Sequence, residues 1–66
     1  MWNLEGLKVS GMYMNEFPVT GVVELSRVMY GGRVSHHVIL TTPIVVYNEI
    51  RDRVILEHQF VESVRS

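Results

Sequence analysis

Residues 18–43 have the sequence PVTGVVELSRVMYGGRVSHHVILTTP, in which two runs rich in Val, Ile, Thr and Tyr flank Gly31-Gly32. These residue types favour the pleated, half-buried surface of a β-strand. Glycine accepts a positive φ without steric cost, so two glycines between such runs predict a two-residue hairpin turn. We therefore expect one long antiparallel hairpin, against which the rest of the chain packs.

A turn at Gly31-Gly32 also predicts the register of the hairpin, because side chains alternate between the two faces of a strand. The pairs expected on one face are Met29 with Val34, Arg27 with His36, Leu25 with Val38, and Val23 with Leu40. This face is apolar except at Arg27 and His36, so we expect it to cover the core while its tip extends into water. A slip by one residue would invert both faces, so the hydrophobic pattern should determine the register.

Three shorter runs outside the hairpin are also expected to be strands: Leu7–Met14, Ile44–Tyr47 and Arg53–Glu57. Turns are expected at residues 15–18, at a break over residues 41–43, and in a polar connection from Asn48 to Asp52. Gly11 and Gly21 lie inside strand patterns, which indicates a bulge or a close backbone approach. The tail from His58 to Ser66 fits either a helical turn or a strand. We favour a single turn at His58-Gln59 followed by a closing strand beside Leu7–Met14.

Five or six short antiparallel strands without a long helix predict an all-β domain, either a small barrel or an open meander that a second copy completes. The order of a strand with an internal glycine, a long bent hairpin, two shorter strands and a tight turn before the last strand resembles that of SH3-like barrels, over residues 7–65. The resemblance lies in strand order and glycine placement. The aromatic ALYDY-type run of peptide-binding SH3 domains is absent, with Met12-Tyr13-Met14 its nearest counterpart, so no binding residues are carried over.

The composition favours a single domain spanning residues 1–66. A chain of this size buries only about 60% of its unfolded surface, and without cysteine it forms no disulfide. Tight packing or a partner is then the expected support. The formal charge of −1 gives no general attraction to phosphate or to anionic membranes. No apolar run approaches the roughly 20 residues that span a bilayer, and the start does not resemble a signal peptide, so we expect a cytoplasmic protein.

No motif for catalysis, metal binding or a cofactor stands out, and we expect none of these. His36 and His37 are neighbours on a predicted strand, so they point to opposite faces and do not chelate one metal. The carboxylates at Glu49 and Asp52 have no apparent pocket to shift their pKa values. No serine lies in a nucleophile elbow, and Gly31-Gly32 lacks the strand-to-helix context of a phosphate loop.

The function that the sequence favours is a small non-catalytic module that binds another protein, with self-association into a homo-oligomer as one form of this. An apolar fraction of 47% in so short a chain motivates this hypothesis. We expect strand addition at an uncovered sheet edge. The predicted contact residues are Arg27, Tyr30, Arg33, Ile44, Val46 and Tyr47.

Two other functions remain open at this point. One is a nucleic-acid-binding accessory barrel, in which arginines and tyrosines contact phosphates and bases. Its residues would be Arg27, Arg33, Arg51 and Arg53 with Tyr30 and Tyr47. The other is a metal-dependent or hydrolytic role, which the sequence favours least.

Overall fold

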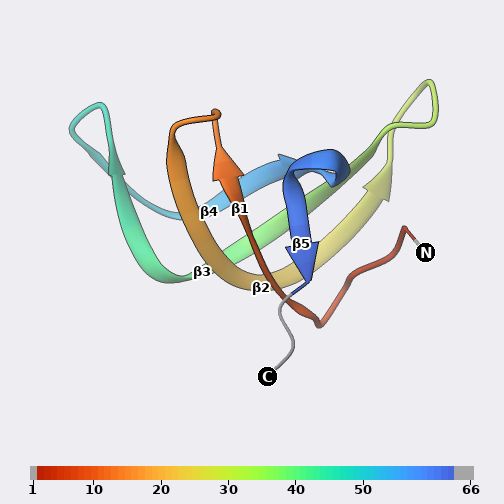
Figure 1. Cartoon of the computed structure of the whole chain (residues 1–66), viewed down its shortest axis with the longest axis horizontal. Helices are drawn as coiled ribbons and strands as arrows, with labels where there is room; N and C mark the ends of the chain where they lie inside the picture. Colours follow the sequence, from red (N-terminus) through yellow and green to blue (C-terminus); the bar gives the residue numbers. More distant parts are fainter. Residues whose placement is uncertain (1, 64–66) are drawn as a thin grey trace.

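The computed structural model describes residues 2–63. Those residues form a single antiparallel sheet and one short 3-10 turn, which confirms the all-β prediction (Figure 1). The elements are β1 (Lys8–Tyr13), β2 (Phe17–Val28), β3 (Val34–Val46), β4 (Glu49–Glu57), η1 (His58–Phe60) and β5 (Val61–Ser63). Within this part of the chain, no helix is long and apolar enough to cross a bilayer.

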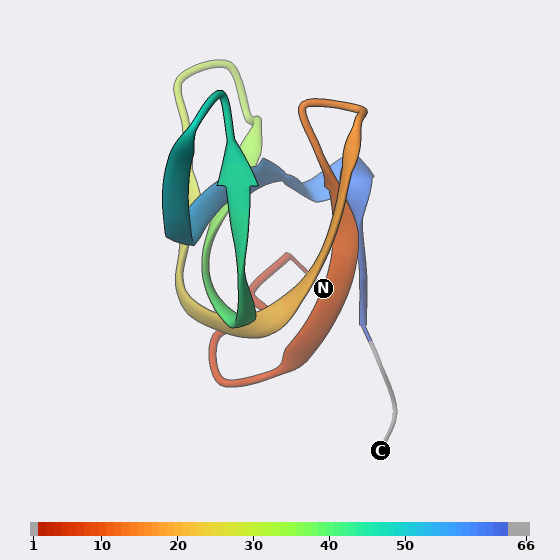
Figure 2. The same cartoon turned by 90° about the vertical axis from the view of Figure 1, so that its left-hand side faces the viewer.

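The strands are arranged in the order β4-β3-β2-β1-β5. The first four form a meander, and β5 returns to pair with β1, Val9 lying opposite Ser63. The predicted turn at His58-Gln59 and the closing strand beside the first strand are therefore both confirmed. The sheet is strongly curved, so that β1 approaches β4 across its concave side (Figure 2). No ladder joins β4 to β5 within residues 2–63, so the sheet is open and is not a closed barrel.

The hairpin of β2 and β3 forms as expected, but its predicted register is wrong. Leu25 pairs with His37 and not with Val38, and Arg27 pairs with Ser35 and not with His36. One cause lies at the turn. Gly31 and Gly32 do adopt a positive φ, but the loop holds three residues, 30–32, and is closed by a hydrogen bond from the Gly32 N–H to the Met29 carbonyl oxygen at 3.0 Å.

The second cause is a β-bulge at Glu24, where the register shifts between Val23 and Leu25. A bulge places an extra residue on one strand and reverses the alternation of the side chains beyond it. Leu25 consequently points outward, with 40% of its surface exposed, and Ser26 takes the buried position that the sequence assigned to an apolar residue.

The core lies on the concave side of the sheet and is mostly valine. Its buried members are Val9, Val19, Val23, Val38, Leu40, Val54 and Leu56. The close backbone approaches that were predicted at two glycines are confirmed. A Cβ at Gly21 would lie 2.1 Å from the Ile39 carbonyl oxygen, and one at Gly11 would lie 2.3 Å from the Phe60 carbonyl oxygen. These glycines let the sheet curl tightly around so small a core.

The second half of the chain has fewer breaks than predicted. The expected break at residues 41–43 lies inside β3, and the run Ile44–Tyr47 forms the end of that strand and its turn. The turn to β4 is tight, because Tyr47 and Asn48 both adopt a positive φ. The β3–β4 ladder is interrupted after the pair Ile39 and Arg53 and resumes at Ile44 and Arg51. Residues 40–43 thus bulge opposite a single residue of β4, and β3 bends there.

Candidate functional site

The predicted contact residues fall into two groups at opposite ends of the molecule, so they do not form one surface. Arg27, Tyr30 and Arg33 are exposed at the β2–β3 tip, where Tyr30 is fully accessible to water. Residues 44–47 lie at the far end of the long axis, at the β3–β4 turn (Figure 1). A partner that bound both groups would have to span the whole domain.

At the β3–β4 end, two of the predicted residues point inward. Val46 is buried, with 3% of its surface exposed, and Ile44 is half-buried against the core. The outward-facing residue between them is Val45, 63% exposed, and its cross-strand partner is Ile50, 78% exposed. Together with the exposed Tyr47 in the turn, these two residues make a small apolar surface. We call Val45, Tyr47 and Ile50 the β3–β4 patch.

The alternation of residues 44–47 was the signal that could have identified this patch from the sequence. Side chains at neighbouring strand positions face opposite ways, so Val45 and Val46 could not both face a partner. Ile50 was missed because it was assigned to a polar connection. In the structure that connection is the start of β4, and Ile50 lies directly opposite Val45.

The patch adjoins an open sheet edge. β4 is the terminal strand of the sheet, and no strand among residues 2–63 pairs with its outer side. Such an edge presents unpaired backbone N–H and C=O groups to any extended chain that approaches it. Most of β4 is exposed, from Glu49 to Arg53. The edge and the patch therefore form a continuous surface with both backbone hydrogen-bonding groups and apolar side chains.

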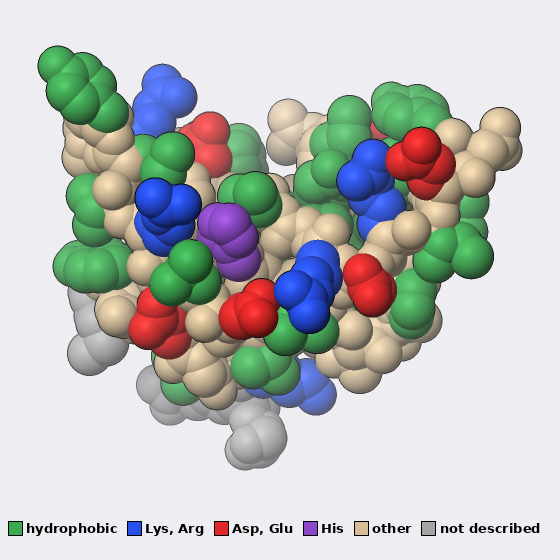
Figure 3. Space-filling view, turned by 180° about the vertical axis from the view of Figure 1, so that it is seen from behind, with side chains coloured by type: hydrophobic (Ala, Val, Ile, Leu, Met, Phe, Trp, Pro, Cys, Tyr) green, Lys and Arg blue, Asp and Glu red, His purple; other side chains and the backbone are tan. Residues whose placement is uncertain are grey.

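The arginines near this edge are paired with acidic neighbours. Arg51 contacts Glu49 at 3.0 Å, and Arg53 contacts Glu24 at 3.6 Å, with all four side chains substantially exposed. Basic and acidic side chains are correspondingly interspersed on the face shown in Figure 3. A phosphate backbone would meet a balanced surface at this edge, whereas Arg27 and Arg33, the other arginines of the nucleic-acid hypothesis, lie at the opposite tip.

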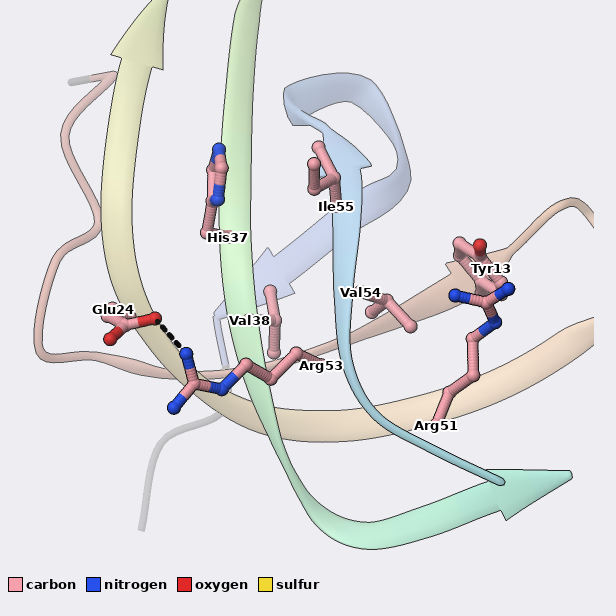
Figure 4. Close-up of a pocket in the computed structure, with 8 residues that line it drawn as sticks. All are labelled: Tyr13, Glu24, His37, Val38, Arg51, Arg53, Val54 and Ile55. Carbon is pink, nitrogen blue, oxygen red and sulfur yellow. Dashed lines mark ion pairs between the residues drawn. The ribbon is translucent and has the colours of Figure 1, made fainter. Parts of the chain in front are cut away.

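A hollow of about 350 Å³ lies beside the interruption of the β3–β4 ladder. In Figure 4 the Arg51 side chain extends toward Tyr13, whereas Arg53 extends toward Glu24. The two guanidinium groups therefore point away from each other and do not converge on one ligand. The residues that line the hollow are Tyr13, Glu24, His37, Val38, Arg51, Arg53, Val54 and Ile55.

A chain of buried and part-buried hydrogen bonds crosses the concave side near the other end of the sheet. The Ser26 hydroxyl lies 2.7 Å from His36 Nδ1, and His36 Nε2 lies 2.8 Å from His58 Nδ1. The Leu4 N–H donates to Ser26 Oγ at 3.0 Å, and the Ser26 N–H donates to Glu5 Oε2 at 2.9 Å. This chain joins β2 and β3 to the N-terminal segment and to η1.

His36 is the central member of this chain and is completely buried. Burial lowers the pKa of its imidazole, and the neighbouring His58 lowers it further. A neutral ring has one N–H and one lone pair, so both of its nitrogens can be satisfied by Ser26 and His58. The sequence did not suggest this cluster, because Arg27 was expected opposite His36 and because His58 is 22 residues away.

Ser, His and a third polar group in a row also occur in hydrolases, where an accessible hydroxyl attacks the substrate. Here Ser26 is buried, and its oxygen is already bonded to the Leu4 N–H and to His36. It is not among the residues that line the hollow of Figure 4. The geometry therefore favours a role in holding the fold together over a role in attack on a substrate.

Comparison of the chain with protein-family models, with curated proteins and with solved structures finds no match. The resemblance to SH3-like barrels thus stays a prediction from strand order.

Proposed function

We propose that this protein is a non-catalytic interaction module that binds an extended protein segment by strand addition along the outer edge of β4. The open β4 edge beside the β3–β4 patch is the observation that carries the proposal. In strand addition, backbone hydrogen bonds give affinity and side-chain contacts on alternate residues give specificity. Both kinds of contact are available at this edge.

The side chains near the edge define the kind of segment that fits. Val45 and Ile50 offer an aliphatic pair to one residue of the segment, and the adjacent Tyr47 extends that contact. Arg51 and Arg53 lie farther along β4 and suit an acidic side chain, which would exchange with their present carboxylate partners. We expect segments of five to seven residues in β conformation, with an aliphatic or aromatic residue near an acidic one.

A random peptide display library tests this proposal, because it presents many extended segments without a partner having to be chosen in advance. The decisive variant is Ile50→Lys, which places a charge in the patch at a highly exposed position and should leave stability within about 0.5 kcal/mol. Val28→Lys is the matched control, since Val28 is also exposed but lies on β2 near the opposite tip. Selected peptides should bind the Ile50→Lys variant at least tenfold more weakly than the wild type, and they should bind the Val28→Lys variant with wild-type affinity. Failure to enrich any peptide, or equal binding to Ile50→Lys, would reject the proposal.

A second copy of the chain is one candidate for the extended partner. If two β4 strands pair antiparallel about Ile50, Glu49 of each copy lies opposite Arg51 of the other, and the two isoleucines meet. This is a favourable arrangement of charge and apolar surface. Sedimentation velocity up to high micromolar concentration tests it. A dimer that Ile50→Lys dissociates supports self-association, whereas a monomer throughout rejects it and leaves peptide binding to be judged by display.

A further inference from the structure

The number of protons that the His36 and His58 rings can bind is limited as long as the hydrogen bond between them persists. It joins two imidazole nitrogens, His36 Nε2 and His58 Nδ1, at 2.8 Å. One of these nitrogens must carry a hydrogen and the other must offer its lone pair. The neutral pair meets this condition.

One additional proton can be accommodated without breaking the chain. His58 would then donate from Nδ1 to His36 Nε2, and His36 would donate from Nδ1 to Ser26 Oγ, which lies 2.7 Å away. A second additional proton cannot be accommodated, because both facing nitrogens would carry a hydrogen. Two cationic rings would also lie with their centroids 5.0 Å apart, one of them in a buried site.

The other groups around His36 offer little compensation for such a charge. Ser26 faces His36 from β2, and the residue opposite His36 on β4 is the apolar Leu56. From the N-terminal segment, the carboxylate of Glu5 accepts the Ser26 N–H. Among residues 2–63, the carboxylates beside η1 in the chain are Glu57, which accepts from Gln59 at 3.3 Å, and Glu62 on β5, both exposed, and Tyr13 on β1 lines a hollow with Glu57 and Phe60.

The element that holds His58 is weakly anchored compared with the strand that holds His36. η1 has three residues and none of them is buried. It continues into β5, which also has three residues and, within residues 2–63, pairs with β1 alone. His36, in contrast, lies in a strand of 13 residues that is paired on both sides. When the two rings can no longer share a hydrogen bond, His58 is therefore the one that leaves.

We propose that the Ser26–His36–His58 chain is an acid-sensitive switch that releases η1 and β5 from the sheet while β1–β4 stay folded. Release uncovers the outer edge of β1 and the backbone at Gly11, which the Phe60 carbonyl now covers. At the side of the sheet opposite β4, acid would thus replace the three-residue β5 by the six-residue β1 as the edge strand. The switch does not depend on whether the β4 edge binds a partner.

Amide hydrogen exchange followed by NMR at pH 7.5 and pH 5.0 tests the switch, with rates expressed as protection factors to remove the intrinsic effect of pH. The released state binds one more proton than the closed state. The equilibrium constant for release of η1 and β5 should therefore increase by up to about tenfold per pH unit below the ordinary histidine pKa of about 6.5. We expect the protection of amides in η1 and in the β1–β5 ladder to fall at least tenfold. Amides in the β2–β3 ladder exchange through global unfolding and should lose several-fold less protection than those of the β1–β5 ladder.

Two variants make the result specific to the pair. His58→Gln keeps a side chain that can hydrogen-bond to neutral His36 and does not titrate, so its β1–β5 protection should change less than threefold between the two pH values. His37→Gln removes the outward-facing histidine and should respond to pH as the wild type does. Imidazole ¹⁵N shifts of the wild type should show one N–H shared between His36 and His58 at pH 7.5.

Three outcomes would overturn the switch. The first is unchanged β1–β5 protection at pH 5.0 in the wild type. The second is an equal loss of protection in the β2–β3 ladder, which would indicate global unfolding. The third is a pH response in His58→Gln as large as in the wild type. The imidazole shifts are recorded on the unaltered protein, so absence of a shared N–H would reject the proposal even if His58→Gln failed to fold.

Discussion

Replacement of Gly21 by alanine tests the account of how this sheet curls. The added methyl group would lie 2.1 Å from the Ile39 carbonyl oxygen and 2.8 Å from Val38 Cγ1. Gly21 does not require a positive φ, so the effect comes from contact and not from a forbidden backbone conformation. The oxygen belongs to the backbone of β3, which cannot rotate away as a flexible side chain would. To reach an ordinary separation, the two strands must move apart by roughly 1 Å.

The expected magnitude follows from two opposing effects. An alanine in place of glycine stabilises by about 0.4–1 kcal/mol when it fits, because it restricts the unfolded chain. Overpacking a well-filled interior costs about 1–3 kcal/mol and occasionally more. Here the clash is between the backbones of the two longest strands, so we expect a net loss of about 3 kcal/mol. A domain of this length has a total stability of about 3–10 kcal/mol, so the variant should lose at least about a third of it.

Urea unfolding monitored by far-UV circular dichroism at pH 7.5 and 25 °C measures this loss. Thr20→Ala is the control, because Thr20 is the exposed neighbour of Gly21 on the same strand and should cost less than about 1 kcal/mol. If Gly21→Ala unfolds within about 0.5 kcal/mol of the wild type, the close approach of β2 and β3 at this point is not a real constraint, and the reasoning about the curl is wrong.

Three further predictions use the same unfolding assay. Ser26→Ala leaves His36 Nδ1 without its partner and should cost about 1–3 kcal/mol; no loss would contradict a structural role for the chain. The pKa of His36 is lowered by burial and then by His58, so the unfolded state binds more protons than the folded state at acidic pH. The free energy of unfolding should therefore be at its full value above about pH 6.5 and should fall as the pH is lowered further. A free energy of unfolding that stays constant down to pH 5 would contradict this. Val38→Ala removes two methyl groups from the core and should cost about 2 kcal/mol, whereas Val45→Ala, on the exposed patch, should cost less than about 0.5 kcal/mol; equal losses would contradict the assignment of the two faces.

Local signals in the sequence were sufficient for β1, for the β2–β3 hairpin and for the return of the last strand to the first, but they divided β3 at residues 41–43 and missed the start of β4. They were not sufficient for the register, because two one-residue irregularities near each other alter it. The loop of three residues at Gly31-Gly32 and the bulge at Glu24 each shift the pairing. No composition signal marks Glu24 as a bulge. It differs in this from Gly11 and Gly21, whose lack of a side chain indicated the close approaches correctly.

The candidate site was harder to predict because it depends on those details. The β3–β4 patch required knowing that the turn occupies only Tyr47 and Asn48, so that Ile50 already lies in a strand opposite Val45. The Ser26–His36–His58 chain required the bulge, which turns Ser26 inward, and also the return of η1 onto β3. Contacts between residues that are far apart in the sequence, such as His36 and His58, do not produce a periodic pattern that a single sequence could reveal.

The central claim is that the β4 edge binds an extended segment through its backbone. The most direct measurement is an N-methyl scan of a peptide selected by display, in which each backbone N–H is blocked in turn and the dissociation constant is measured. Because only alternate amides of an added strand face its neighbour, the account predicts large losses of affinity at every second residue and small ones between them. Losses without this alternation, or none at all, would show that the peptide binds through its side chains and would contradict strand addition at β4.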